Sequence, residues 1–204
     1  MPNWVDNTLT VTGDEDAVNA FAERAARPHT RWGENNKYQH VEAIAFWNFL
    51  RPDDSELDEY HGREPHKATL AEALKFESNH WYDWNVRNWG CKWDASNVDM
   101  FERSSREVRY TFDTPWSPPL EFFTAVVAMY PKLDFEIRFI EEQGWGGEWH
   151  ASGGTHWIVE EWEIPVTHEQ SIERKAYCHC ESMTEEEVQY MYDDCPKKKE
   201  LANA

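Results

Sequence analysis

Residues 4 to 12 alternate between apolar and polar side chains, which is the pattern of a β-strand with one buried face. The next segment repeats its apolar side chains at helical spacing, so residues 15 to 25 are expected to form an amphipathic helix. The apolar positions of this helix are Val18, Phe21, Ala22 and Ala25. Pro28 cannot continue a helix and marks its end. The chain therefore opens with a strand followed by a helix.

The pattern weakens between residues 29 and 78, and we interpret this region as an insertion after the first helix. Its apolar positions predict one short amphipathic helix within residues 67 to 76. The next helix is expected to begin at Asn79, a suitable N-cap residue, and to end at Gly90, which suits a left-handed C-cap.

A β-hairpin follows, with strands at residues 97 to 102 and 107 to 113. Ser117 is the expected N-cap of the helix after it, because Pro118 then occupies the first helical position, where its missing donor is harmless. Residues 133 to 139 alternate again and predict another strand.

The remaining segments are shorter. A further hairpin is expected at residues 145 to 164, with Gly153 and Gly154 in its turn. Thr184 and Glu187 form a capping box that begins a short helix. The residues from Lys197 onward are interpreted as a mobile tail.

This order of elements, β-α-β-β-α-β, predicts an α+β fold of the ferredoxin-like type, with an antiparallel sheet and both helices on one face. We expect a ferredoxin-like domain at residues 1–165, with the insertion at 29–78 and the extra C-terminal hairpin at the edge of the sheet. Residues 166–204 are expected to form an acidic C-terminal extension with a short helix.

The chain has a formal net charge of −19, and 14 acidic but only two basic residues lie between Glu141 and Cys195. This charge repels phosphate backbones, so direct binding of duplex nucleic acid is not expected, whereas a protein with a basic surface is a suitable partner. The candidate residues for such a contact are Glu160, Glu161, Glu163, Glu185, Glu186 and Glu187. Apolar runs are too short to span a membrane and the start lacks a secretory signal pattern, so we expect a cytoplasmic protein.

Residues 79 to 95 contain four of the chain's 12 tryptophans, mixed with acidic, amide and basic side chains. Such a segment either fills the core, binds a planar nucleotide-like ligand by stacking, or contacts a protein. The candidate ligand-binding residues are Trp81, Asp83, Trp84, Asn88, Trp89, Lys92, Trp93, Asp94 and Trp116. A hypothesis that the sequence also offers is a local basic patch beside them, formed by Arg87, Lys92, Arg103, Arg106 and Arg109.

Two groups of side chains raise the question of a metal. Cys178, His179, Cys180 and Cys195 offer zinc ligands, but the spacing departs from that of zinc sites, so we expect unligated thiols and no cofactor. Glu148, His150, His156 and Glu160 lie on the predicted last hairpin, where they form either a metal site or a set of surface side chains. No catalytic motif accompanies them, so a metal-dependent enzyme is an alternative and not the main expectation.

Several motifs occur here in one order: Met-Pro-Asn-Trp at residues 1–4, Trp-Tyr-Asp-Trp at 81–84, Asn-Trp-Gly-Cys-Lys-Trp-Asp-Ala at 88–95 and Trp-Ser-Pro-Pro at 116–119. Together they resemble the YubB-like ferredoxin-fold domain family, which phages and plasmids encode. The chain departs from that family at Cys91, where Thr is expected, and around residues 144–148. The resemblance implies the ferredoxin-like backbone without an iron–sulfur cluster, and it implies no catalytic residues.

From these observations we expect a non-enzymatic accessory protein of a phage or plasmid, acting in the cytoplasm of the bacterial host. It would bind a host protein with a basic surface, for example a component of a defence system, through its acidic residues. The alternative is a protein that sequesters a nucleotide-like small molecule with the tryptophan-rich segment.

Overall fold

The structure is a computed structural model that describes residues 2–30, 39–62, 79–174, 184–188 and 190–203. The helix predicted at residues 67–76 lies outside these ranges. The described strands are β1 (Trp4–Thr12), β2 (Ser96–Arg103), β3 (Glu107–Pro115), β4 (Asp134–Glu141), β5 (Gly146–Ser152) and β6 (Thr155–Trp162). The described helices are α1 (Glu15–Ala25), η1 (Phe46–Asn48, a 3-10 turn), α2 (Leu57–Tyr60), α4 (Trp81–Trp89), α5 (Leu120–Met129), α6 (His168–Glu173), α7 (Glu185–Val188) and α8 (Pro196–Ala202).

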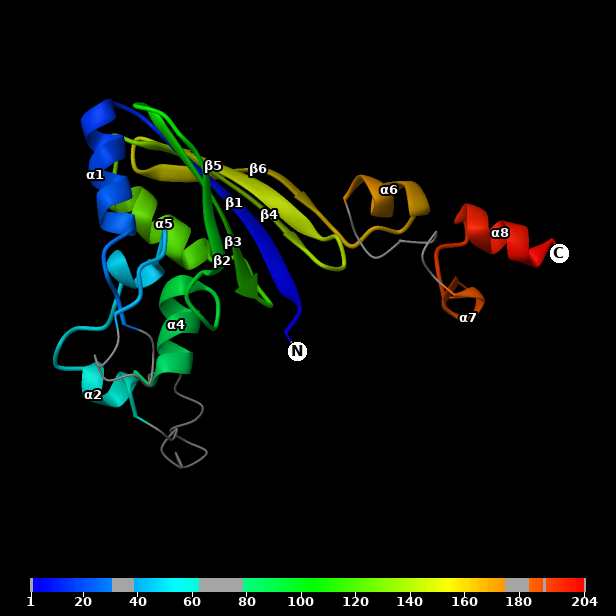
Figure 1. Cartoon of the computed structure of the whole chain (residues 1–204), viewed down its shortest axis with the longest axis horizontal. Helices are drawn as coiled ribbons and strands as arrows, with labels where there is room; N and C mark the ends of the chain where they lie inside the picture. Colours follow the sequence, from blue (N-terminus) through cyan, green and yellow to red (C-terminus); the bar gives the residue numbers. More distant parts are fainter. Residues whose placement is uncertain (1, 31–38, 63–78, 175–183, 189, 204) are drawn as a thin grey trace.

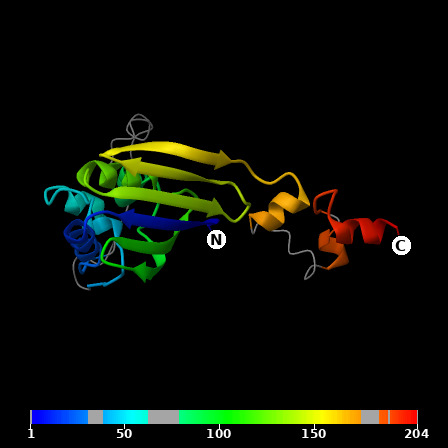
Figure 2. The same ribbon diagram turned by 90° about the horizontal axis from the view of Figure 1, so that it is seen from above.

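The six strands form one antiparallel sheet in the order β2-β3-β1-β4-β5-β6. The first four positions of this order are those of two split βαβ units, so the predicted ferredoxin-like α+β fold is confirmed. Strands β5 and β6 extend the sheet beyond β4 as a hairpin (Figure 2).

Helices α1, α4 and α5 lie on one side of the sheet, together with η1 and α2 (Figure 1). Alternation along β1 explains this arrangement, because Val5, Leu9 and Val11 are buried toward the helices. The helices contribute a matching apolar face, in which Phe21 of α1 and Phe122 of α5 are fully buried. The opposite face of the sheet carries the alternate, mostly polar residues of each strand.

A buried amide inside β1 ties the centre of the sheet together. Asn7 is fully buried, and its Nδ2 donates to the carbonyls of Val5 and Phe112 and to the Oγ1 of Thr114 at 2.8–3.1 Å. Because a buried amide is costly unless it is hydrogen-bonded, this network favours one register between β1 and β3.

Two helix starts differ from the prediction. Helix α4 begins after His80 instead of Asn79, whose side chain amide donates to Glu56 of the insertion. Helix α5 begins after Pro119 instead of Ser117, because the Ser117 hydroxyl donates to the carbonyl of Gly90 at 2.6 Å. Tertiary hydrogen bonds therefore engage both side chains that were expected to cap these helices. The left-handed C-cap at Gly90 is confirmed, with φ of +83°.

The C-terminal segment has more helix than the single one expected. The capping box is present, since the Thr184 amide donates to Glu187 Oε2 at 2.8 Å. A mobile tail was expected from Lys197 onward, but residues 197–202 belong to α8. Pro196 suits a first helical turn, and Lys198 Nζ donates to the carbonyl of Met191 at 2.8 Å, which anchors the helix.

Helix α6 connects this segment to the sheet. The guanidinium of Arg174 lies 5.8 Å from the ring centroid of Trp162, and its Nη1 donates to the carbonyl of Glu163 at 2.6 Å. The extension continues beyond the end of the sheet, away from the helical layer (Figure 1). None of the helices in the described ranges is long and apolar enough to span a membrane.

Candidate functional site

The tryptophan-rich segment divides into a buried half and a surface half. Trp84 and Trp89 are 5% and 2% exposed, and their rings meet edge to face at 5.6 Å between centroids. Trp89 also contacts Phe46 and donates from Nε1 to the carbonyl of Leu50 at 2.9 Å. The structure therefore places these two tryptophans in the core, beneath the insertion.

Two of the predicted polar ligand contacts also have structural partners. The carboxylate of Asp94 accepts from the amides of Phe46 and Trp47 at 2.6 and 3.1 Å, so it caps the N-terminus of η1. Asn88 Nδ2 donates to the carbonyl of Trp84 one turn earlier. Asp83 lies partly exposed in the first turn of α4, where its charge favours the helix dipole.

The surface half surrounds the ammonium of Lys92. Its Nζ lies 4.7 Å from the ring centroid of Trp93 and 4.8 Å from that of Trp116, and Trp81 and Tyr82 follow at 5.7 and 5.8 Å. Trp4 joins this group through its contact with Trp93 at 6.1 Å. We name this cluster the aromatic ledge. It comprises Trp4, Trp81, Tyr82, Lys92, Trp93 and Trp116.

The backbone presents one ring of the ledge in an unusual way. Trp116 has a φ of +65°, in the left-handed region that non-glycine residues rarely occupy. Its amide donates to the carbonyl of Asn3 at 2.8 Å, and the Thr114 hydroxyl donates to the carbonyl of Ser117 at 2.8 Å, which hold this turn in place. The conformation leaves the Trp116 ring 47% exposed beside Lys92. Strained residues of this kind occur frequently at functional sites.

A pocket of about 450 Å³ lies next to the ledge, between the insertion, α4 and the start of β2. Its aromatic lining consists of Trp47, Tyr60, Trp81, Trp89 and Trp93. The polar side chain of Asn85 faces it but is already engaged, because it accepts from the Tyr60 hydroxyl at 2.9 Å and donates to the carbonyl of Lys92 at 2.8 Å. The polar residues His29, Thr30, Asp94, Ser96 and Asn97 also line the pocket, so it offers both ring faces and hydrogen-bonding groups.

Sequence reasoning missed two members of the ledge, Trp4 and Tyr82. Both residues lie within the motifs that carried the family resemblance, and those motifs were the sequence signal that could have identified them.

The structure does not assemble the expected basic patch. Arg106 pairs with Asp14 at the start of β3, whereas Trp116 follows the end of that strand. A strand of this length spans about 30 Å, so the two positions lie at opposite ends of the sheet.

The acidic candidates fall in two separate places. Glu160 and Glu161 lie on β6, Glu163 follows it, and all three are exposed. Glu186 and Glu187 belong to α7, which both views show beyond α6 and away from β6 (Figures 1 and 2). Glu185 is the first residue of α7. The two groups therefore do not form one continuous surface among the described residues.

Strand β6 is an edge strand with a mixed surface. Its residues pair only with β5 within the described part of the chain. Trp157, Ile158 and Val159 are each about half exposed, at 49%, 52% and 49%. Exposed apolar residues on an unpaired sheet edge are typical of a surface that another chain covers. The carboxylates of Glu160, Glu161 and Glu163 follow directly along the chain, and we name residues 157–163 the acidic edge.

The structure separates the two histidines of the last hairpin. His150 pairs with Trp157 on the polar face of the sheet, whereas His156 stacks on Trp149 at 5.2 Å and contacts Phe123 of the helical layer. The structure therefore does not support the alternative in which both histidines share one metal site, because adjacent positions on paired strands alternate between the faces.

The cysteine group is described only in part. Cys178, His179 and Cys180 lie outside the described residues. Cys195 is buried against Met191 and Tyr192. Cys91 is also buried, and burial raises the pKa of its thiol well above the usual value, so this sulfur is not a reactive nucleophile.

Residues 88–191 match the family model described as the ferredoxin-like domain in Api92-like protein. The chain belongs to this family. A crystal structure of a protein api92 from Yersinia pseudotuberculosis is similar, with a TM-score of 0.49 and 11% sequence identity over 81% of this chain and 99% of that chain. No curated protein matches the sequence.

Proposed function

We propose that the protein acts by binding a protein partner with a basic surface, through the acidic edge. The observation that carries this proposal is the position of Trp157, Ile158 and Val159, which are half exposed on an unpaired edge strand directly before a run of carboxylates. Apolar side chains of this kind supply affinity, and the surrounding charges supply orientation and the rate of encounter. The net charge of −19 favours basic partners further.

In this proposal the protein is a non-enzymatic accessory factor of a phage or plasmid. Its place of action is the cytoplasm of the infected or plasmid-bearing bacterium, and its partner is a host protein such as a defence component. The support for this biological setting is the motif resemblance at residues 1–4, 81–84, 88–95 and 116–119.

The experiment compares charge reversals at two places. The wild type is used to capture a partner from the bacterial host, and the partner is identified by native mass spectrometry and purified. Binding is then measured for E160K/E161K/E163K and for a control with the same charge change elsewhere, E23K/D53K/D99K. We expect the first variant to lose at least tenfold in affinity and the control to lose much less. Equal losses of affinity in both variants would contradict the proposal, because they would show that the net charge of the protein, and not the acidic edge, determines binding.

A second candidate function is binding of a nucleotide-like small molecule at the aromatic ledge. The specific observation in its favour is the pocket of about 450 Å³, lined by aromatic rings, beside the ammonium of Lys92. A base would stack on these rings at about 1–3 kcal/mol each, and Lys92 would meet a phosphate. It ranks second because the polar groups of Asn85 and Asp94 already have internal partners.

Calorimetry with mononucleotides and cyclic oligonucleotides tests the second candidate. Binding that is lost in Trp93→Ala and Trp116→Ala but retained in E160K/E161K/E163K would support it. The absence of heat for every nucleotide would reject it and leave the acidic edge as the remaining site.

A further inference from the structure

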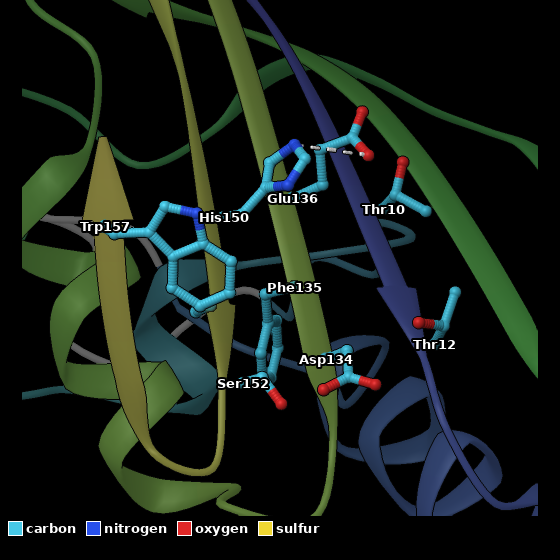
Figure 3. A pocket seen from close by; sticks show the side chains of 9 residues that line it. Thr10, Thr12, Asp134, Phe135, Glu136, His150, Ser152 and Trp157 are labelled. Carbon is cyan, nitrogen blue, oxygen red and sulfur yellow. Dashed lines mark ion pairs between the residues drawn. The ribbon is translucent and has the colours of Figure 1, made fainter. Parts of the chain in front are cut away.

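A group of metal-binding side chains lies on the polar face of the sheet, away from the aromatic ledge. Thr10, Glu136, His150 and Trp157 occupy one register row across β1, β4, β5 and β6. Glu148 lies two residues before His150 on β5 and therefore points to the same face. Figure 3 shows Glu136 and His150 directed toward each other above the sheet, with Trp157 beside them.

The distances between the donor atoms are close to those that a bound metal ion requires. His150 Nε2 lies 2.8 Å from Glu148 Oε1 and 3.7 Å from Glu136 Oε2. One donor atom from each of the three residues lies within 4.8 Å of the others. Metal–ligand bonds of about 2.0–2.2 Å in a tetrahedral site place neighbouring donors about 3.3–3.6 Å apart. To reach this geometry, the carboxylate of Glu148 has to move away from Nε2 of His150 and that of Glu136 has to move closer.

Among the described residues, His150 is the ion-pair partner of both carboxylates, and it is charged only when protonated. Within the described ranges, neither Glu136 nor Glu148 forms an ion pair with a lysine or arginine. Arg138 lies opposite Glu148 in the backbone pairing of β4 and β5. Its guanidinium, however, lies over the ring of Trp162, at 5.4 Å from the centroid. Asp134 adds a further carboxylate to the same surface. A divalent ion at the point where the two carboxylates converge on the imidazole nitrogen would relieve their mutual repulsion.

The cluster also borders open space. A pocket of about 360 Å³ extends from His150 along Glu136 to Asp134, Ser152 and Thr12, with Trp157 as a side wall (Figure 3). A metal held by three protein ligands keeps an open coordination position for water or another ligand. The pocket provides room for that position on the solvent side.

We propose that Glu136, Glu148 and His150 bind a divalent first-row transition-metal ion, with Zn²⁺ and Co²⁺ as the best matches. One imidazole nitrogen and two carboxylates form a mixed donor set that suits these ions better than Mg²⁺ or Ca²⁺, which bind through oxygen alone. The ion replaces the hydrogen bond between Nε2 of His150 and Glu148. The three ligands come from β4 and β5, and the site adjoins the acidic edge, where Trp157 and Glu160 lie opposite His150 and Glu148.

The test uses the full chain with Cys178, Cys180 and Cys195 replaced by serine, so that thiols do not compete for the metal. Calorimetry with Zn²⁺ is expected to show one site per chain. His150→Ala and Glu136→Gln are each expected to weaken it at least tenfold. His156→Ala is the matched control, since it removes a histidine from the same hairpin but from the opposite face, and we expect it to bind Zn²⁺ as the parent does.

A spectroscopic measurement locates the ion. Co²⁺ bound at this cluster is expected to quench part of the tryptophan fluorescence, and Trp157→Phe is expected to remove most of that quenching, because the Trp157 ring lies 6.1 Å from the His150 ring. The proposal is overturned if His150→Ala and His156→Ala bind Zn²⁺ equally, or if binding disappears entirely once the cysteines are replaced.

Discussion

The carboxylate of Asp94 accepts a hydrogen bond of 2.6 Å from the backbone amide of Phe46, a residue 48 positions earlier in the chain. A second bond from the amide of Trp47 completes the cap of η1, and Phe46 inserts its ring between Trp89 and Phe122. The end of the tryptophan-rich segment therefore holds the insertion on the helical layer. This relationship gives Asp94 a structural role, while the same residue also lines the pocket beside the aromatic ledge.

Replacing Asp94 is expected to destabilise the fold. Asp94→Ala removes a charged cap and leaves two amides without acceptors, which costs about 2–3 kcal/mol of unfolding free energy. Urea denaturation measures this loss. Asp83→Asn, in the first turn of α4, is the control and is expected to cost less than about 1 kcal/mol. Similar losses in both variants would contradict the capping role.

The tryptophans of residues 81–93 are expected to respond differently to truncation. Trp84→Ala and Trp89→Ala leave large cavities in the core and should cost about 3–5 kcal/mol each. Trp93→Ala removes a surface ring and its contact with the Lys92 ammonium, which costs about 1 kcal/mol. Thermal unfolding of the three variants checks this order. Losses of ligand binding in the first two variants would therefore report unfolding, and only Trp93 and Trp116 are suitable for testing the ledge.

Because the backbone of Trp116 is left-handed, glycine is expected to be more stable than alanine at this position, which is the reverse of the usual order. Trp116→Gly should be more stable than Trp116→Ala by about 1 kcal/mol, because glycine adopts a φ of +65° without a steric penalty. At Trp93, where φ is not positive, the order should be reversed. The measurement is the difference in urea midpoint within each pair. The same order at both positions would argue against strain at Trp116.

The hydroxyls of two buried tyrosines are expected to contribute differently to the free energy of unfolding. The Tyr60 hydroxyl donates to Asn85, so Tyr60→Phe leaves a buried amide oxygen without its donor and costs about 1–3 kcal/mol. The Tyr110 hydroxyl has no hydrogen-bond partner among the described residues. Tyr110→Phe is therefore expected to be neutral or stabilising. Chemical denaturation at pH 7 compares the two, and a comparable loss in Tyr110→Phe would indicate a partner for its hydroxyl.

Alkaline pH is expected to destabilise the protein through the same side chain. Burial raises the pKa of Tyr110 to about 12, whereas an unfolded tyrosine titrates near its ordinary value of 10.0. The folded state therefore keeps a proton that the unfolded state loses, so the contribution of Tyr110 is complete below pH 10 and falls as the pH rises toward 12. The slope approaches about 1.4 kcal/mol per pH unit for one group.

Unfolding free energies between pH 9 and 11.5 test this dependence. Tyr110→Phe should show a shallower decline than the wild type, while Tyr190→Phe, which removes a 79% exposed side chain, should follow the wild type. Parallel declines for all three proteins would show that other groups dominate. Burial also raises the pKa of Tyr60. Tyr60 therefore accounts for part of the pH dependence of the unfolding free energy that remains in Tyr110→Phe.

The sequence by itself determined the order of the elements and the ferredoxin-like topology. Val5, Leu9 and Val11 alternate within one strand, and Val18 and Phe21 share one helical face, so these patterns are local and can be read directly from the chain. Gly90 was equally readable, because a left-handed C-cap at the end of a helix favours glycine over residues with a Cβ atom.

Only the tertiary structure decided which polar and aromatic residues are structural and which form a site. Asp94 and Ser117 resembled a ligand contact and a helix cap, but their partners, Phe46 and Gly90, come from distant segments. Trp84 and Trp93 have the same chemistry and differ only in what packs over them. Glu136 and His150 converge because β4 and β5 pair in one particular register, and a shift of one residue would place them on opposite faces of the sheet.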